Sequence, residues 1–327
     1  MLRGGTTRAA AILAAALSLG TPAAREGAGA AGPLPRSSLR VQRDGEWRAW
    51  WRSERAPRRW TSAPLADAVD WRAAAPGLEW GTLRLAGSGE AWRLRVVVVR
   101  LDPARHRFRL ALRGDEAGRG TWTVDSASAD AALAVNAGQF TRGVPWGWIV
   151  REGRELQRPG RGPLSAAFVV DSAGRPSIVP VESLAVLRAR GAADLAFQSY
   201  PAVLGGDGEV PAALRASGAG VDLAHRDARL ALGQTRDGRL LIALTRFDAA
   251  GEALQALPFG LTVPETAALM GALGAWRAVL LDGGISAQLA LRGAHDPPSG
   301  VAEGAPRPLR GWRGLRSVPM GLEAIPR

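Results

Sequence analysis

Cysteine and lysine are both absent from this 327-residue chain. Without cysteine there are no disulfide bonds, no thiolate chemistry and no cysteine-based zinc site. Histidine is scarce: His106, His225 and His295 lie far apart and show no metal-ligand spacing. The P-loop, the Gly-x-Ser-x-Gly elbow and the His-Glu-x-x-His helix are missing as well. These absences exclude thiol enzymes and the enzyme classes that those motifs mark.

Arginine supplies all of the side-chain positive charge, and the formal net charge is +12 with a pI of about 11.5. The arginines are spread over nearly every segment, in a chain rich in Ala, Gly, Leu and Arg, as a GC-rich coding bias would produce. A nucleic-acid-binding protein instead clusters its charge in a recognisable module. We therefore predict no nucleic-acid partner, whereas anionic ligands that carry phosphate are compatible with this composition.

The N-terminus has the pattern of an export signal. Arg3 and Arg8 precede an apolar run over residues 9–19, which is too short to span a bilayer, and small residues follow at 21–24. No later segment is long and apolar enough to be a transmembrane helix. We predict a signal peptide over residues 1–24 and an exported mature chain, periplasmic or extracellular, without a transmembrane segment. The alternative is an uncleaved anchor.

Residues 25–70 comprise a Gly/Ala/Pro-rich linker and a segment rich in tryptophan and arginine. Its four tryptophans, interleaved with arginines, are Trp47, Trp50, Trp51 and Trp60. Such a segment could bind a membrane surface or an acidic glycan. We favour an alternative in which the tryptophans pack on the domain surface with arginines stacked on them, because Pro57 and scattered acids interrupt any amphipathic helix. Residues 71–327 are predicted to form one domain.

Apolar runs from residue 71 onward predict a β-rich domain. Strands are expected at 78–85, 92–101, 108–112, 133–135 and 278–281. Turn sequences at 150–154, 170–174, 205–208 and 236–239 are spaced as in antiparallel sheet. Helices are expected at 125–132 and at 262–273, where Thr262 and Glu265 form a capping box and Pro264 suits the first turn.

A turn is predicted between the apolar runs 278–281 and 289–291, at Asp282-Gly283-Gly284-Ile285-Ser286. Two glycines beside an acid at a strand end leave backbone amides uncovered and let a substrate come close. The alternative is an ordinary tight turn between buried strands. Asn136 ends the 133–135 run in a similar way, and open α/β sheets bind ligands at such carboxyl ends.

Four short motifs, taken in order, resemble those of the phosphodiester glycosidase family. They are Asn136-Ala137-Gly138-x-Phe140; Gln198-Ser199-Tyr200-Pro201 before a Gly-Asp-Gly turn; Arg229-x-Ala231-x-Gly233 before Asp237-Gly238; and Leu281-Asp282-Gly283-Gly284-x-Ser286. Together they span most of residues 76–325. The resemblance implies an α+β fold with β-rich mixed sheets, flanking helices and a single phosphodiester-glycosidase-like domain. It also implies an activity, removal of the sugar from a sugar-1-phosphodiester.

The resemblance further implies a set of site residues. Asn136, Arg229 and Asp282 match the family's Asn, Arg and acid and would be catalytic. The expected substrate-binding residues are Gly283, Gly284, Ser286, Arg226, His225, Gln198 and Ser199. Two positions depart from the family pattern, since Leu230 stands where Thr is common and Ile285 where a third Gly is frequent. We interpret both departures as altered substrate contacts.

The chemistry of glycosyl phosphodiester cleavage fits these residue types. The reaction develops positive charge on the sugar and releases a phosphate anion. Arg229, with Arg226, offers a fork-shaped partner for phosphate, whereas Asp282 could be an acid/base, a nucleophile or a stabiliser of the sugar cation. Its usual partner would be a second carboxylate, but neither Asp222 nor Asp227, which lie near Arg229 in sequence, belongs to a motif of the family.

Several alternatives stay open at this point. Arg229 could form a structural salt bridge, and Asn136 could be an amide that caps a turn rather than a ligand for a sugar hydroxyl. No cofactor is predicted, although a divalent metal at Asp282 is an alternative for which the sequence shows no ligand cluster. The predicted substrate is a phosphorylated glycan or sugar phosphodiester of the envelope or surroundings. The competing function is a non-catalytic glycan- or envelope-binding module, which would be favoured if Leu230 and Ile285 filled the cleft.

Overall fold

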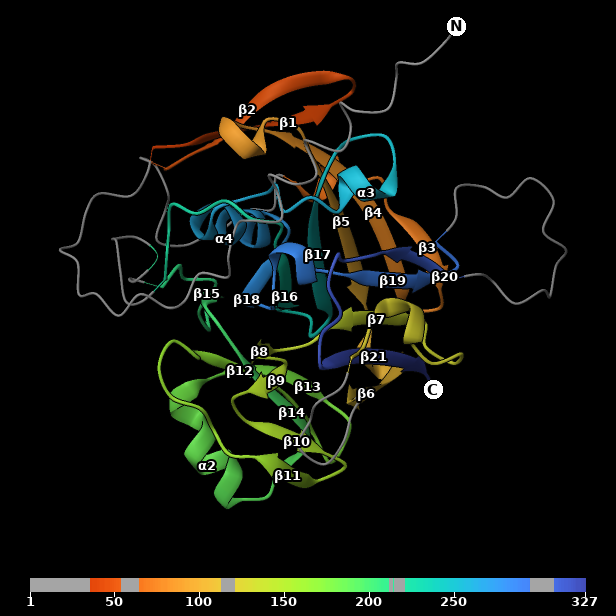
Figure 1. Cartoon of the computed structure of the whole chain (residues 1–327), viewed down its shortest axis with the longest axis vertical. Coiled ribbons are helices and arrows are strands. Elements are labelled where there is room, and N and C mark those ends of the chain that lie inside the picture. Colours follow the sequence, from red (N-terminus) through yellow and green to blue (C-terminus); the bar gives the residue numbers. More distant parts are fainter. Residues whose placement is uncertain (1–35, 54–64, 113–120, 212–213, 215–220, 295–308) are drawn as a thin grey trace, which may run out of the picture. The chain divides into compact units, whose positions relative to one another are not determined.

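The computed structural model describes residues 36–53, 65–112, 121–211, 214, 221–294 and 309–327, so the predicted signal peptide and Trp60 lie outside the described residues. Strands dominate the described chain, and helices are few (Figure 1). The predicted β-rich α+β fold is confirmed. Every strand pair in the described ranges is antiparallel, as the regular spacing of turns predicted.

Nine strands form the first sheet. Eight of them follow one another in the order β15 (Ala202–Leu204), β18 (Ala275–Leu280), β16 (Leu230–Thr235), β17 (Leu240–Phe247), β5 (Leu94–Leu101), β4 (Leu78–Ala86), β1 (Ser38–Arg43) and β2 (Glu46–Arg52), and β3 (Arg72–Ala75) also pairs with β4. The central strand β5 contains four consecutive buried valines at 96–99. Such an unbroken apolar run indicates a strand covered on both faces.

Two five-stranded sheets complete the β structure. One has the order β20 (Leu309–Trp312), β19 (Leu289–Arg292), β7 (Leu133–Asn136), β21 (Met320–Pro326) and β6 (His106–Leu112). The other has the order β11 (Arg154–Gln157), β10 (Ile149–Arg151), β14 (Ala193–Ser199), β12 (Ala166–Asp171) and β13 (Pro176–Pro180). A separate hairpin joins β8 (Gln139–Thr141) and β9 (Val144–Trp146).

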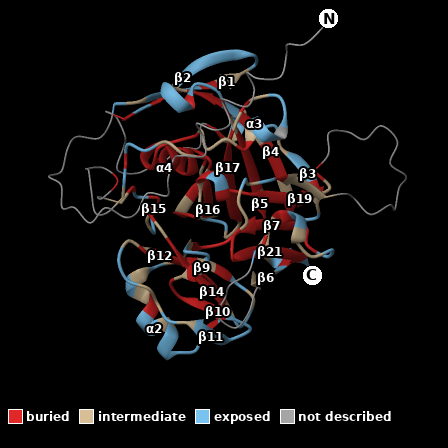
Figure 2. Cartoon of the chain, viewed as in Figure 1, coloured by how far each residue is buried: buried red, intermediate tan, exposed pale blue. Residues whose placement is uncertain are grey.

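The core lies on both faces of the nine-stranded sheet. On β5, Val97 and Val99 belong to an apolar cluster shared with the two five-stranded sheets, whereas Val96 and Val98 belong to a cluster shared with helix α4 (Val263–Ala272). Figure 2 shows the buried residues concentrated in these strands and in α4. The alternation of side chains along one strand thus assigns each face of the sheet to a different neighbour.

Helix α4 confirms the sequence prediction, including its cap: Thr262 N donates to Glu265 Oε2 at 2.8 Å, and Glu265 N donates to Thr262 Oγ1 at 3.3 Å. The other described α-helices are short, α2 (Leu184–Ala189) and α3 (Glu252–Gln255). The helix expected at 125–132 is wrong, because only a 3-10 turn forms at Val124–Ser126. There the Ser126 hydroxyl bonds the backbone of Thr123, a local alternative to helical hydrogen bonds.

The Trp/Arg-rich segment forms the hairpin β1–β2. Strand β1 pairs with β4, so this hairpin is part of the nine-stranded sheet, and the boundary expected before residue 71 does not separate it from that sheet. Trp51 is buried in the core, and Trp47 is exposed with the Arg40 guanidinium carbon 6.0 Å from the centre of its ring. The favoured packing interpretation therefore holds for Trp47, whereas Trp51 lies in the core instead of on the domain surface.

Candidate functional site

The Asp282 turn links two sheets, because it runs from β18 in the nine-stranded sheet to β19 in a five-stranded one. Asp282 N donates to Gly138 O at 3.0 Å, and Gly284 N donates to Ala228 O at 2.7 Å. A Cβ at Gly283 would lie 2.6 Å from Ala228 O, and Gly284 has a φ of +60°. Glycine is thus required at both positions, by a close approach at one and by the left-handed conformation at the other.

Asn136 lies directly behind this turn. Its Nδ2 donates to the carbonyl oxygen of Asp282 at 2.8 Å, and its Oδ1 accepts from Gln288 N at 2.9 Å. The side chain is buried. Both ends of the amide are therefore engaged with backbone on the two sides of the turn, which is the arrangement of the capping alternative. Asn136 and Asp282 come together because two sheets meet here, and not as strand ends of one open α/β sheet.

The carboxylate of Asp282 is 19% exposed, and its Oδ2 lies 3.4 Å from Arg316 Nη2. Burial raises the pKa of Asp282 to about 6, against the opposing effects of the Ser286 hydroxyl and the Arg316 guanidinium. In the orientation that satisfies both ends of the Gln139 carboxamide, its nitrogen donates to Asp282 Oδ1 and its oxygen accepts from Asp282 N, each at 3.3 Å. The geometry thus holds a carboxyl group that changes protonation near neutral pH.

Arg316 is the site residue that the motifs missed. Its Nε donates to the hydroxyl of buried Ser286 at 2.8 Å, and its guanidinium carbon lies 4.8 Å from the centre of the Phe140 ring. The backbone amides of Leu315 and Arg316 both donate to Ile285 O, at 2.7 and 3.1 Å. The aromatic at the end of the first motif was the available signal, because guanidinium groups stack on aromatic rings.

A buried arginine, Arg246, fixes the segment that carries Arg316. Arg246 Nη2 donates to the carbonyl oxygens of Ala287, Trp312 and Arg313, at 2.6, 3.0 and 3.0 Å. Burial lowers the pKa of Arg246 to about 10. One guanidinium therefore ties the end of the Asp282 turn to the strand that precedes Arg316.

Arg229 and Arg226 do not form the open phosphate fork expected from the sequence. Arg229 Nε donates to Leu261 O at 2.8 Å, and its Nη2 donates to His225 O at 2.7 Å. Arg226 makes a two-point ion pair with fully buried Glu265, at 2.5 and 2.7 Å. Burial lowers the pKa of Arg229, and Asp227 gives the largest opposing effect. These two arginines therefore brace the chain beside the turn.

Gln198 and Ser199 are both fully buried, so neither presents a surface to a substrate, in contrast to the prediction. Gln198 Oε1 accepts from Trp148 N and Gly160 N, at 2.7 and 2.8 Å, and Ser199 Oγ donates to Leu280 O at 2.5 Å. Ser199 thus fastens the second five-stranded sheet to the strand that leads into Asp282.

The two departures from the family motifs also differ from our interpretation. Leu230 is completely buried in the core, so it is not a substrate contact. The side chain of Ile285 is 38% exposed, and its carbonyl oxygen receives the Leu315 and Arg316 amides. Leu230 is thus part of the core, and Ile285 is partly exposed to solvent.

His225 and Asp227 lie on the other side of the turn. The His225 ring is half exposed, and its Nε2 is 3.8 Å from Asp227 Oδ2. Burial raises the pKa of Asp227, and charge repulsion from Asp227 in turn raises that of Asp282. Burial, and then the charge of Asp282, raise the pKa of Tyr200. The two carboxylates therefore share one electrostatic environment.

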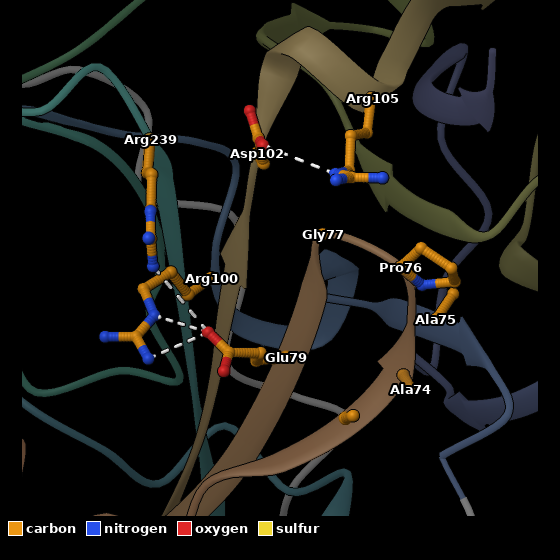
Figure 3. Close-up of a pocket in the computed structure, with 10 residues that line it drawn as sticks. Ala74, Ala75, Pro76, Gly77, Glu79, Arg100, Asp102, Arg105 and Arg239 are labelled. Atoms are coloured by element: carbon orange, nitrogen blue, oxygen red, sulfur yellow. Dashed lines mark hydrogen bonds and ion pairs between the residues drawn. The ribbon is translucent and has the colours of Figure 1, made fainter.

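One cavity of the structure lies away from the candidate residues. A cavity of about 540 Å³ is lined by Ala73–Gly77, Glu79, Arg100, Asp102, Arg105 and Arg239, and none of these is a candidate residue. Figure 3 shows its arginines paired with carboxylates, with Arg100 Nε donating to Glu79 at 2.8 Å. Within the described ranges, no cluster of three acidic or histidine side chains is placed to hold a metal ion. No helix in those ranges is long and apolar enough to cross a membrane.

Comparison with known proteins gives one match by sequence profile and several by structure. Two solved structures share the fold. The zebrafish N-acetylglucosamine-1-phosphodiester alpha-N-acetylglucosaminidase catalytic domain, auto-inhibited by its pro-peptide, is 18% identical with a TM-score of 0.57, over 80% of this chain and 87% of that one. A hypothetical protein from Synechocystis is 16% identical with a TM-score of 0.54, over 89% and 68%.

No curated protein matches the sequence significantly. The phosphodiester glycosidase profile matches residues 129–322, a range that contains Asn136, Arg229, Asp282 and Arg316. The match covers more than half of the sequence and includes all four motifs. This chain therefore belongs to the phosphodiester glycosidase family.

Proposed function

We propose that this protein hydrolyses the glycosidic bond of a sugar-1-phosphodiester and that Asp282 is the reacting carboxylate. The observation that carries the proposal is the Asp282 carboxyl group itself, which is partly open in a glycine turn, lies 3.4 Å from a guanidinium and has a pKa raised to about 6. Titratable groups with strongly shifted pKa values occur preferentially at functional sites. Family membership and the activity in the name of the zebrafish relative agree with this reaction class.

The chemistry assigns different tasks to the acid and to the arginine. In the reaction the bond between the sugar C1 and the phosphate oxygen breaks, and its electron pair leaves with the phosphate monoester. Asp282 serves as acid/base, nucleophile or stabiliser of the positive charge on the sugar. We assign the phosphate contact to Arg316 instead of Arg229, because Arg316 is 35% exposed whereas the Nε and Nη2 of Arg229 are engaged by carbonyl oxygens.

Three residues then support the site without meeting the substrate. Asn136 holds the backbone of Asp282, Arg229 holds the chain that carries Ala228, and Ser286 orients Arg316. Catalytic geometry tolerates little displacement, so such supporting contacts affect activity strongly. The export-signal pattern of residues 1–24 leads us to expect a substrate outside the cytoplasm. We propose a phosphorylated glycan of the envelope or surroundings.

The test measures phosphomonoester release from a panel of sugar-1-phosphodiesters by the purified chain. Asp282→Asn is assayed beside it, and Asp222→Asn is the control because Asp222 is exposed and only caps the amides of Ala224 and His225. The proposal expects activity in the parent and control and at least a hundredfold loss in Asp282→Asn. Equal activity in all three proteins would remove Asp282 from the mechanism.

Non-catalytic glycan binding is the second candidate. The specific observation in its favour is that both arginines expected to bind phosphate, Arg226 and Arg229, are engaged within the protein. Measurable binding of a phosphorylated glycan, with no turnover by the parent on any member of the panel, would favour this function over hydrolysis.

A further inference from the structure

We propose that Asp227 is the second carboxylate of the site and takes the proton from the water that attacks the sugar. The assignment rests on the proposed function and extends it. Asp227 lies outside every motif of the resemblance, so the case for it comes from geometry alone.

The backbone around Asp227 is fixed against the Asp282 turn. Asp227 N donates to Leu261 O at 3.2 Å, and Leu261 N donates to Asp227 O at 3.0 Å. At the next residue, the carbonyl oxygen of Ala228 accepts a hydrogen bond from Gly284 N at 2.7 Å. The backbone around Asp227 and the backbone of the Asp282 turn are therefore held side by side.

The side chain of Asp227 lies over the turn. A Cβ at Gly284 would be 2.9 Å from Asp227 Oδ2 and 3.0 Å from its Oδ1, so both carboxylate oxygens occupy the space that a side chain at position 284 would take. The carboxylate is 22% exposed, close to the 19% of Asp282. Two partly open carboxylates thus lie beside the same glycine turn, and glycoside hydrolysis commonly uses a pair of carboxyl groups.

Charge distribution separates the roles of the pair. His225 Nε2 lies 3.8 Å from Asp227 Oδ2. Burial raises the pKa of Asp227, and the charges of Arg229 and His225 oppose that effect. Asp282 instead lies 3.4 Å from Arg316, the residue that we assign to the phosphate contact. In the step itself, the water oxygen bonds to C1 and the C1–O electron pair leaves with the phosphate monoester. One water proton passes to the Asp227 carboxylate.

Two measurements test the assignment. The first is kcat for Asp227→Asn, with Asp222→Asn as the matched control and with added azide as a small nucleophile that needs no base. The second does not depend on activity: a carboxyl ¹³C titration of Asp282 in the parent and in Asp227→Asn. Asp227→Ser is measured in parallel in case the amide variant is poorly folded.

The proposal expects at least a hundredfold loss of kcat in Asp227→Asn with KM little changed, and partial recovery with azide as a glycosyl azide forms. It also expects the pKa of Asp282 to fall when the neighbouring charge is removed. Retention of kcat within threefold by both variants would overturn it, as would an Asp282 titration that does not respond. An inactive parent with coupled titrations would instead defeat the proposed hydrolysis while leaving the carboxylate pair in place.

Discussion

Arg246 donates to the carbonyl oxygen of Ala287 at 2.6 Å and thereby connects strand β17 to the end of the Asp282 turn. The same nitrogen also holds the carbonyl oxygens of Trp312 and Arg313. A buried guanidinium without a carboxylate partner carries a large desolvation cost. Its hydrogen bonds to three backbone carbonyl oxygens offset part of that cost.

Arg246→Met should therefore destabilise the protein by about 2–4 kcal/mol, because three backbone acceptors lose the hydrogen bond that Arg246 donates. The Arg316 segment should loosen with it, and kcat should fall as well. Urea unfolding and the phosphodiester assay measure the two effects. Arg239→Met, at a mostly solvated arginine with 43% exposure, is the control and should shift stability by less than about 0.5 kcal/mol. An unchanged unfolding midpoint in Arg246→Met would contradict this account.

Asp282→Asn should make the protein more stable at pH 7 while it removes activity. The pKa of Asp282 is raised by burial to about 6 from an ordinary 3.8, so the folded state binds the proton more tightly than the unfolded state. Stability contributed by the protonated carboxyl is present below pH 4 and is lost as pH rises through about 6. The cost at pH 7 is at most about 3 kcal/mol. Thermal unfolding of parent and variant at pH 4 and pH 7 checks the sign: the gain should appear only at pH 7.

Arg316→Ala should raise KM for a phosphodiester substrate about tenfold to a hundredfold, since a charge-assisted contact contributes about 1.5–3 kcal/mol. The pKa of Asp282 should also rise, because Arg316 favours its charged form. A pH–rate profile reports both effects. Arg313→Ala is the matched control on the same segment, as Arg313 pairs with Asp125 at the surface instead. Equal KM values in the two variants would move the phosphate contact to another residue.

Gly284→Ala should reduce kcat more than its backbone strain alone explains. The residue has φ near +60°, and its new methyl group would meet the Asp227 carboxylate. Gly238→Ala provides the comparison, because Gly238 has φ near +85° with nothing within 4 Å of the added Cβ. Both variants should lose about 1 kcal/mol or more of stability. A kcat loss of similar size in both would show that position 284 matters only for folding.

Local sequence patterns predicted much of this fold and part of the site. The capping box at Thr262 and the unbroken valines of β5 depend on neighbours in sequence, and both predictions are confirmed. Asn136 and Asp282 were predicted to belong to one site, and Asn136 Nδ2 donates to the backbone carbonyl oxygen of Asp282. The hydrogen-bond partners of Arg229 and Gln198 could not be predicted from the sequence. Arg229 Nε donates to Leu261 O and Gln198 Oε1 accepts from Gly160 N, and both partners lie in distant segments of the chain.

Arg316 was missed for the same physical reason. Nothing near it in sequence distinguishes it from the many other arginines of the chain. Its role depends on its contacts with Phe140 and Ser286, which folding brings close from distant parts of the sequence. A residue whose role is set only by tertiary contacts shows no periodicity or cap that a sequence pattern could detect.

The junction of sheets at the Asp282 turn also bears on how such a protein can be recombined. The backbone amides of Asp282 and Gly284 donate to the carbonyl oxygens of Gly138 and Ala228, and the amide of Arg316 donates to the carbonyl oxygen of Ile285. In a chimera between two relatives, a crossover between residues 138 and 284 or between residues 285 and 316 would draw the donor and the acceptor of at least one of these bonds from different parents. Interchangeable parts of this protein should therefore be sought at its edges, such as the β1–β2 hairpin, where exchange leaves every one of these contacts within a single parent.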